Sequence, residues 1–273
     1  MLSTLLRLAP SAFLRWLKRR HDRSALVRRL VDPFSARLRG REVRIRHGAA
    51  AGLLISTEGG TVSYGIGTAE PLIQRTLQRH VRAGGTFYDI GANVGFFTLV
   101  GAQLVGERGH VVAFEPAPAT AALLSANVAR NGLDRVRLLD IALGDRTGEA
   151  HFAVMAENQY GRMAHLDDGS IATVEQIGVR VERLDALVDE GLPPPTIIKM
   201  DIEGAETEAL RGMETTLREH HPVVLCELHG TQREVAAAFE AHGYTLRGLD
   251  DVRETEEPYR AGAPYSHLLA LPT

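Results

Sequence analysis

The chain has 273 residues, of which 44% are hydrophobic and 24% charged, and these values are typical of a globular protein rather than a disordered one. Its single cysteine, Cys226, excludes an intramolecular disulfide. No apolar run reaches about 20 residues, so no membrane-spanning helix is predicted. The net charge of −3 hides an asymmetry, because residues 1–46 contain 13 basic and three acidic residues. A basic N-terminal arm therefore precedes an acidic body.

Residues 1–42 are predicted to form a basic N-terminal helical extension. Its apolar residues, among them Phe13 and Leu17, fall near one face at helical spacing, and Pro10 is expected to kink the helix. Arg7 interrupts the short apolar run, which argues against a secretory signal. The extension either packs on the body with a solvated basic face or lies on an anionic membrane surface. We therefore expect a cytoplasmic protein, with peripheral contact to the inner face of the membrane as the alternative.

Residues 43–83 are predicted to be a lead-in segment of short strands and one helix. Val43-Arg44-Ile45-Arg46 alternates apolar and charged residues, as a half-buried strand does. Glycines punctuate the following residues up to 66, which predicts short extended pieces joined by turns. A helix is expected over 69–82, with Pro71 near its first turn.

Residues 84–273 are predicted to be one domain in which strands alternate with helices. We expect strands at 86–90, 111–115, 136–139, 196–201 and 222–227, and helices over 94–105, 117–130, 183–187, 205–218 and 231–242, with closing strands near Tyr244–Leu246 and His267–Leu271. Residues 150–182 are expected to be hairpin-like or irregular and to form part of a substrate lid. Near-continuous apolar strands between helices favour an α/β fold with a parallel sheet covered on both faces.

The most informative stretch is Asp89-Ile90-Gly91-Ala92-Asn93-Val94-Gly95, which follows a predicted strand and opens a helix. Open parallel sheets bind ligands at the carboxyl ends of their strands, and a helix N-terminus favours an anionic group there. A dinucleotide fingerprint needs a glycine in the second place, where its backbone meets the pyrophosphate. Asn93 stands in that place, so a ligand without a pyrophosphate, such as S-adenosylmethionine, fits better.

The ends of the next two predicted strands extend this pattern. Glu115 follows Gly91 by 24 residues, at the end of the second strand, where an acidic residue accepts both ribose hydroxyls of a nucleoside. The third strand ends at Asp140-Ile141-Ala142, where the edge of an adenine is expected. The loop that begins at Gly91 and the acidic residue Glu115 at the end of the next strand together predict a nucleoside-type cofactor.

The run FYDIGANVGFFTLVGAQLVGERGHVVAFEPAPATAALLSANVARNGL, followed by ALGD, IIKMDIEGAETEALRGM and CELHG, resembles the FkbM-type methyltransferases. The upstream SYGIGTAEPLI resembles the lead-in of that family, and the resemblance covers roughly residues 43–249. It implies a Rossmann-like class I methyltransferase fold with a mostly parallel seven-stranded sheet. It also implies methyl transfer from S-adenosylmethionine, usually to an oxygen of a sugar, a glycolipid or a polyketide-type metabolite.

The resemblance also assigns cofactor-binding residues in this chain. Carried over one by one, these are Asp89, Gly91, Asn93 and Gly95 at the methionine end, Thr98 at its carboxylate, Glu115 with Pro116 at the ribose, and Asp140 and Ala142 beside the adenine. Glu70, in the lead-in, is placed above the cofactor. The alternative for Glu70 is a solvated acid in the first turn of a helix.

A hydroxyl nucleophile has to lose its proton, so a base or a metal ion is expected near the strand ends. Asp201 follows the fourth strand and is the candidate for facing substrate or cofactor, while Glu227 and His229 follow the fifth. An imidazole with the ordinary pKa of about 6.5 accepts a proton near neutrality, which makes His229 the candidate general base. The same three residues are the candidate ligands of a divalent metal ion. Because Mg²⁺ prefers oxygen ligands, the histidine favours another ion or none.

Other functions remain open at this stage. An N- or carboxyl-methyltransferase uses the same cofactor, and a nicotinamide-dependent oxidoreductase uses a related sheet, although Asn93 argues against it. A non-catalytic module that docks through the basic arm is a third possibility. Nucleic acid is not expected as a partner, because aromatic residues are only 5% and the body is acidic. The expected partner is a small-molecule or glycan substrate, and a homodimer is compatible with the sequence.

Overall fold

The computed structural model describes residues 40–155, 161–163 and 173–273, so nearly all of the predicted basic extension lies outside the described residues. The first half of the described chain contains β1 (Glu42–Arg44), β2 (Leu54–Ser56), α4 (Val62–Ile66), α5 (Pro71–His80), β3 (Thr86–Ile90), α6 (Phe96–Val105), β4 (His110–Phe114), α7 (Pro118–Arg130), β5 (Val136–Leu139) and β6 (Ala142–Leu143). The second half contains β7 (Gly148–Met155), β8 (Gly161–Met163), β9 (Thr173–Glu182), α8 (Leu184–Asp189), β10 (Ile197–Met200), α9 (Glu206–Arg211), α10 (Glu214–His220), β11 (Val223–Glu227), α11 (Gln232–Ala241), β12 (Tyr244–Asp250), β13 (Thr255–Pro258) and β14 (His267–Pro272).

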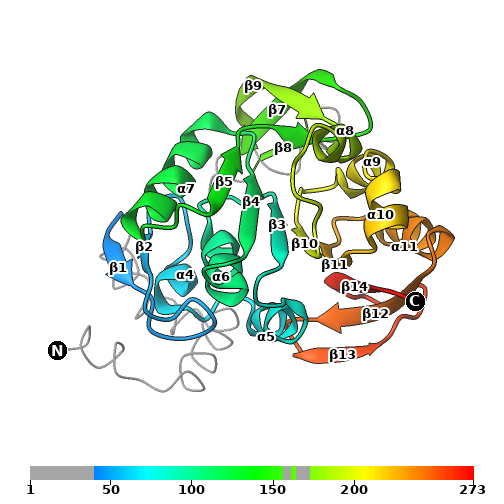
Figure 1. Cartoon of the computed structure of the whole chain (residues 1–273), viewed down its shortest axis with the longest axis horizontal. Coiled ribbons are helices and arrows are strands. Elements are labelled where there is room, and N and C mark those ends of the chain that lie inside the picture. Colours follow the sequence, from blue (N-terminus) through cyan, green and yellow to red (C-terminus); the bar gives the residue numbers. More distant parts are fainter. Residues whose placement is uncertain (1–39, 156–160, 164–172) are drawn as a thin grey trace.

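The main sheet is mixed and has the strand order β13-β12-β14-β11-β10-β3-β4-β5 (Figure 1). The five strands from β11 to β5 run parallel, and β14 pairs antiparallel with both β11 and β12. This confirms the predicted α/β fold with a mostly parallel sheet. The described chain has eight strands in the sheet where seven were expected, because β13 adds an antiparallel edge strand to β12.

The order of the strands fixes where a ligand can bind. From β3 the chain continues outward to β4 and β5, while β10 pairs with the opposite edge of β3 and leads on to β11. This change of direction leaves a crevice outside the carboxyl ends of β3 and β10, which is where open α/β sheets bind their ligands. The loops after Ile90 and Met200 therefore meet at one place.

Helices cover the sheet on both faces (Figure 1), and alternate residues of each strand pack into two separate cores. Tyr88 and Ile90 of β3 belong to the core that α9, α10 and α11 cover. Phe87 of the same strand belongs to the core that α5 and α6 cover. Each central strand is therefore apolar along its whole length, which is the pattern that predicted the parallel sheet.

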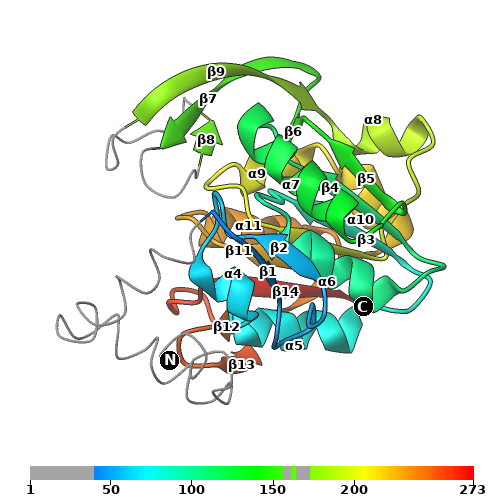
Figure 2. The ribbon, with the colours of Figure 1, turned by 90° about the vertical axis from the view of Figure 1, so that its left-hand side faces the viewer.

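The strands β6, β7, β8 and β9, within residues 142–155, 161–163 and 173–182, build a second, smaller sheet with the order β6-β9-β7-β8. The antiparallel pairing of β7 with β9 confirms the hairpin-like part of the prediction for 150–182, while residues 156–160 and 164–172 lie outside the described residues. Figure 2 shows this sheet standing apart from the main sheet at one end of the molecule. It brings the side chain of Phe152 to the pocket described below.

Two local features differ from the prediction. The helix expected over 205–218 is divided into α9 and α10, since Gly212 lies so close to the loop after β6 that a Cβ there would be 1.9 Å from the carbonyl oxygen of Gly144. The short helix α4 replaces part of the extended segment expected up to residue 66. The helix expected over 117–130 ends where it was predicted to end, and Gly132 just beyond it has a φ of +60°.

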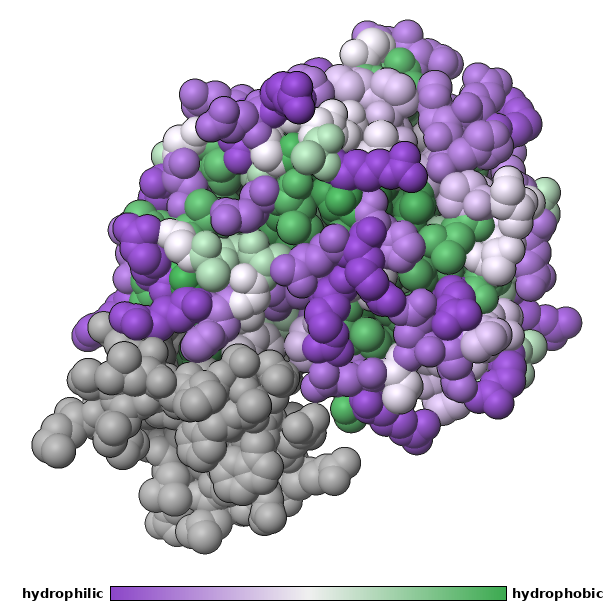
Figure 3. Space-filling model, turned by 60° about the horizontal axis from the view of Figure 1, so that its bottom comes forward, coloured by the Kyte–Doolittle hydropathy of each residue, from purple (hydrophilic) through white to green (hydrophobic). Residues whose placement is uncertain are grey.

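The outer surface of the described chain alternates between hydrophilic residues and small apolar areas, as the face in Figure 3 shows. Among the large apolar side chains of this part of the chain, Val252 is the one that is highly exposed, at 71%. No helix in residues 40–155, 161–163 and 173–273 is long and apolar enough to cross a membrane.

Candidate active site

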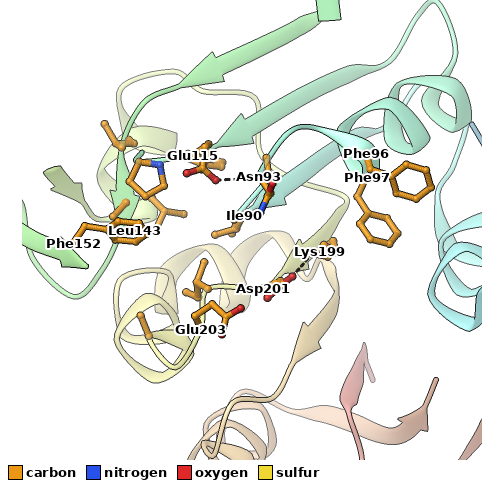
Figure 4. Close-up of a pocket in the computed structure, with 18 of the residues that line it drawn as sticks. Ile90, Asn93, Phe96, Phe97, Glu115, Leu143, Phe152, Lys199, Asp201 and Glu203 are labelled. Carbon is orange, nitrogen blue, oxygen red and sulfur yellow. Dashed lines mark hydrogen bonds and ion pairs between the residues drawn. The ribbon is translucent and has the colours of Figure 1, made fainter. Parts of the chain in front are cut away.

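A pocket opens at the carboxyl ends of β3, β4 and β10, the place where open α/β sheets bind their ligands. Apolar side chains form most of its wall and a few polar groups converge on it (Figure 4); the wall includes Ile90, Phe96, Phe97, Phe114, Ile141, Leu143 and Phe152, and the polar groups are Asn93, Glu115, Lys199, Asp201 and Glu203. The predicted residues Gly91, Pro116 and Ala142 also line this pocket.

The loop after β3 takes a conformation that only certain residues allow. Gly91 has a φ of +78°, and a Cβ at this position would lie 1.8 Å from the carbonyl oxygen of Asp201. Asn93 also has a positive φ, of 50°, which asparagine adopts more readily than most other residues. The loop thus lies directly against the end of β10, and its backbone faces the pocket.

Glu115 is held in place by this loop. Its carboxylate accepts a hydrogen bond at each oxygen, from the backbone N–H of Asn93 (2.9 Å; Figure 4) and from that of Ala117 (3.0 Å). The side chain is buried, and burial raises the pKa of Glu115 to about 7, although the two amide donors partly offset this effect. Each oxygen keeps a further lone pair, so the carboxylate can accept hydrogen bonds from two ligand hydroxyls.

Asp89 and Thr98 lie behind the pocket rather than in it. Asp89 is fully buried, and the hydroxyl of Thr98 donates a hydrogen bond to its Oδ2 (2.6 Å). Thr98 is itself fully buried and bonded in this way, so the prediction that it contacts a ligand carboxylate is not supported. Asp89 Oδ1 has no hydrogen-bond partner among the described residues, and burial raises the pKa of this carboxyl group.

The far wall of the pocket, called the apolar end below, consists of Pro116, Ile141, Ala142, Leu143 and Phe152. Asp140 was predicted beside an adenine, but it is exposed and does not line the pocket. Ile141 and Leu143 are buried in its place. Gly95 lies outside the pocket lining as well, since its Cα faces Leu124 of α7.

Asp201 lies at the opposite side, where Lys199 is its partner. The ammonium group of Lys199 donates a hydrogen bond to Asp201 Oδ2 (3.0 Å) and lies 4.9 Å from the centre of the Phe97 ring. Burial raises the pKa of Asp201, but the charges of Lys199 and His229 lower it more, so the net shift is downward. Asp201 is therefore an ionised carboxylate that faces the pocket.

His229 is surrounded by acidic groups, called the acidic cluster below: Asp201, Glu203, Glu206 and Glu227. Its Nδ1 lies 2.9 Å from Oε1 of the fully buried Glu206, and its Nε2 lies 3.6 to 3.8 Å from the other three carboxylates. Burial lowers the pKa of His229, but the hydrogen bond to Glu206 and the charge of Asp201 raise it by more. The pKa of His229 is therefore raised to about 9.

This environment changes the role expected of His229. The prediction of a general base rested on a pKa near 6.5, and an imidazole with a pKa of about 9 already carries its proton at neutral pH. The structure does bring the three predicted residues Asp201, Glu227 and His229 together, with one ligand atom of each within 4.8 Å of the others. They lie at the ends of β10 and β11, as the sequence predicted.

Glu70 does not line the pocket, in contrast to the prediction that it approaches the cofactor. It precedes α5 and lies beside His267 of β14, whose Nε2 is 3.6 Å from Glu70 Oε2 and 3.4 Å from Glu227 Oε2. Sequence reasoning missed His267, because it stands in an apolar closing strand with no motif around it. It also missed Glu206 as a partner of His229, and Phe96, Phe97 and Phe152 as pocket walls.

The family model described as the methyltransferase FkbM domain matches residues 89–250, which contain the loop after β3, Glu115 and Asp201. The chain belongs to the FkbM methyltransferase family. It is therefore a methyltransferase with the fold of the S-adenosylmethionine-dependent enzymes. This membership argues against the alternative of a nicotinamide-dependent oxidoreductase.

Curated relatives agree with the family. The 31-O-demethyl-FK506 methyltransferase FkbM of Streptomyces tacrolimicus is 30% identical over 215 residues, which are 67% of this chain and 82% of that protein. The 2-O-methyltransferase NoeI of Sinorhizobium fredii is 30% identical over 61% of this chain and 74% of its own length. The hexuronic acid methyltransferase AglP of Haloferax volcanii is 30% identical over 57% of this chain and 60% of its own length.

Proposed function

We propose that this enzyme transfers the methyl group of S-adenosylmethionine to a hydroxyl of a sugar, a glycolipid or a polyketide-type metabolite. The proposal rests on the buried carboxylate of Glu115, which accepts a hydrogen bond from the backbone N–H of Asn93. This carboxylate lines a largely apolar pocket at the carboxyl ends of the strands. One relative is named as a 2-O-methyltransferase, another as a methyltransferase of 31-O-demethyl-FK506 and a third as a hexuronic acid methyltransferase. Their names favour oxygen as the acceptor atom.

The residues of the pocket fit the cofactor. Glu115 has lone pairs for the two ribose hydroxyls, and the apolar end offers Leu143 and Phe152 to the flat face of an adenine. The loop from Gly91 to Asn93 presents its backbone to the methionine part. Behind that loop, Asp89 Oδ1 has no hydrogen-bond partner among the described residues, so it can accept a hydrogen bond from a donor group of the ligand.

Bound S-adenosylmethionine supplies an activated methyl group, so the protein has to orient the acceptor and receive its proton. Asp201 is the residue proposed to receive it, since it is ionised, faces the pocket and lies opposite the apolar end. Lys199 holds Asp201 through one oxygen and leaves Oδ1 available. His229 is a positioning residue in this scheme, because its proton and its bond to Glu206 order the acidic cluster around Asp201.

The test combines binding with product analysis. Isothermal titration of the full chain should show binding of S-adenosylmethionine and of its demethylated product. Incubation with the cofactor and a panel of uronic acids, glycosides and polyketide alcohols should then give a singly methylated product whose new methyl group is on oxygen. Absence of cofactor binding would contradict the proposal. Transfer confined to amines or carboxylates in a matched panel would favour the N- or carboxyl-methyltransferase alternative.

A further inference from the structure

We propose that Glu70, Glu227 and His267 bind one divalent transition-metal ion, of the Zn²⁺ or Mn²⁺ type, beside the acidic cluster. Topology brings these three residues together from distant parts of the chain. His267 of β14 and Glu227 of β11 are paired directly across the antiparallel strands, and Glu70 precedes α5. One ligand atom of each lies within 4.8 Å of the other two.

The nitrogen that faces this group lies at ion-pair distance from both carboxylates but makes no hydrogen bond among the described residues. The side chain of His267 is only 3% exposed, and its Nε2 has no hydrogen-bond partner among the described residues. Glu70 Oε2, which lies 3.6 Å away, is also buried without one. Two buried atoms that need a partner therefore face the same point, and leaving such atoms unpaired is costly. The other nitrogen, Nδ1, lies 3.0 Å from the hydroxyl of Ser266, the kind of contact that orients a metal-binding imidazole.

The distances suit an ion better than a shared proton. His267 Nε2 lies 3.4 Å from Glu227 Oε2 and 3.6 Å from Glu70 Oε2, and both exceed the usual hydrogen-bond range of about 2.7–3.2 Å. Two ligand atoms at about 2.0–2.1 Å from one ion, at a tetrahedral angle, are about 3.4 Å apart. Small movements of two partly exposed carboxylates would complete such a site.

Charge favours this group over the neighbouring one. Asp201, Glu227 and His229 also lie close together, but the ammonium group of Lys199 is already bonded to Asp201. Among the described residues, no lysine or arginine forms an ion pair with Glu70 or Glu227. Two carboxylates and one imidazole suit Zn²⁺ or Mn²⁺, whereas Mg²⁺ prefers oxygen ligands alone.

The proposed site suggests a role that rests on the proposed function. Three protein ligands leave coordination positions open, and Glu227 lies close to Asp201, which faces the pocket. An acceptor hydroxyl bound to the ion would have a lower pKa, as water does on catalytic metal ions. Its proton would then pass to Asp201 as the new carbon–oxygen bond forms and the bond between methyl carbon and sulfur breaks.

Metal binding can be tested without any acceptor. The full chain, freed of metal by a chelator and dialysed, is titrated with Zn²⁺ and separately with Mn²⁺ by calorimetry at constant pH. One of the two ions should bind at one per chain. His267→Gln should weaken this binding at least about 100-fold, since even changes to residues behind a metal ligand cost 10–100-fold. Glu70→Gln, at the more exposed rim, should weaken it as well.

Two controls make the outcome decisive. His229→Gln, in the neighbouring group, should not weaken the binding of the ion, because it removes a positive charge 3.8 Å from Glu227, and all three variants should bind S-adenosylmethionine like the wild type, which shows that they fold. The proposal is overturned if the wild type binds neither ion, if His267→Gln binds it equally well, or if the loss follows His229→Gln instead. Intact metal binding in a protein that methylates no hydroxyl would count against the proposed function alone.

Discussion

The two sides of the pocket are built in different ways. The Gly91 loop and Glu115 come from one short stretch of chain, and Glu115 is held by backbone N–H groups of that stretch. The acidic cluster and the neighbouring Glu70 and His267 come from four segments that only the strand order brings together. The first side is recognisable from a motif, whereas the second depends on the whole topology.

The two sides of the pocket also differ in how their charged groups are paired. Glu115 is a lone carboxylate whose partners are neutral amides, so changing it removes a ligand contact and leaves no charge unpaired. At the acidic cluster, the positive charges of Lys199 and His229 lie 2.9 to 3.8 Å from the carboxylates and compensate their negative charge. A change there therefore alters the charge that the neighbouring groups feel, and its effects should appear in the chemical step.

The largest effect is expected for Asp201→Asn, which keeps the shape of the side chain but removes the proposed proton acceptor. Loss of a general base costs about 10²–10⁴-fold in rate, so kcat should fall by that factor while the affinity for S-adenosylmethionine changes little. Calorimetry and steady-state kinetics on one preparation would separate the two. Thermal unfolding has to accompany them, since Lys199 loses its ionic partner. A large loss of cofactor affinity at unchanged kcat would assign Asp201 to the cofactor instead.

Glu115→Gln should instead weaken the binding of S-adenosylmethionine and change kcat little. Its new amide group places an N–H donor against the N–H of Asn93 or Ala117, and one acceptor for the ribose is lost. Hydrogen bonds to charged groups contribute about 1.5–3 kcal/mol, so the dissociation constant for S-adenosylmethionine should rise about 10- to 100-fold. Asp140→Asn is the matched control, because Asp140 directly follows the next strand, β5, but is exposed and outside the pocket. Equal losses in the two variants would contradict the assignment of the ribose to Glu115.

This contrast also explains what the sequence could predict. The strand before Gly91 and the acid at Glu115 are linked by local spacing, so both could be placed before the structure was known. Asp201, Glu227 and His229 could be placed at strand ends, and the structure brings them together. The pKa of His229 could not be predicted, since it depends on Glu206, which the sequence alone places only on a helix.

The missed features depend on contacts between distant residues. His267 is one histidine in an apolar strand, and only its pairing opposite Glu227 gives it a site. The division of the helix expected over 205–218 depends on the close approach of Gly212 to Gly144. Thr98 was expected in the pocket because it follows the motif, but the helical turn directs its hydroxyl to Asp89. Such outcomes are decided by three-dimensional packing rather than by local pattern.

The pH dependence of cofactor binding provides a third test. Glu115 has a pKa of about 7, raised by burial, and only its ionised form can accept hydrogen bonds from both ribose hydroxyls and both amides. Lowering the pH below about 7 protonates it, so binding then has to release a proton and the affinity should fall by up to about tenfold per pH unit. Calorimetry between pH 5.5 and 8.5 would measure this. A flat profile in the wild type, or an unchanged slope in Glu115→Gln, would contradict it.

The smallest effect is expected for Phe152, a residue of the second sheet whose side chain lines the pocket. Phe152→Leu keeps an apolar side chain but removes the ring, and aromatic stacking contributes about 0.5–1.5 kcal/mol beyond burial. If the ring lies on the adenine, the dissociation constant for S-adenosylmethionine should rise about two- to tenfold while the KM for the acceptor stays the same. If the hairpin belongs to a substrate lid, as expected from the sequence, the KM should change instead. The variant thus decides which side of the pocket β7 and β9 serve. Leu143→Ala, in the same apolar end, measures how much cofactor affinity any apolar truncation there costs.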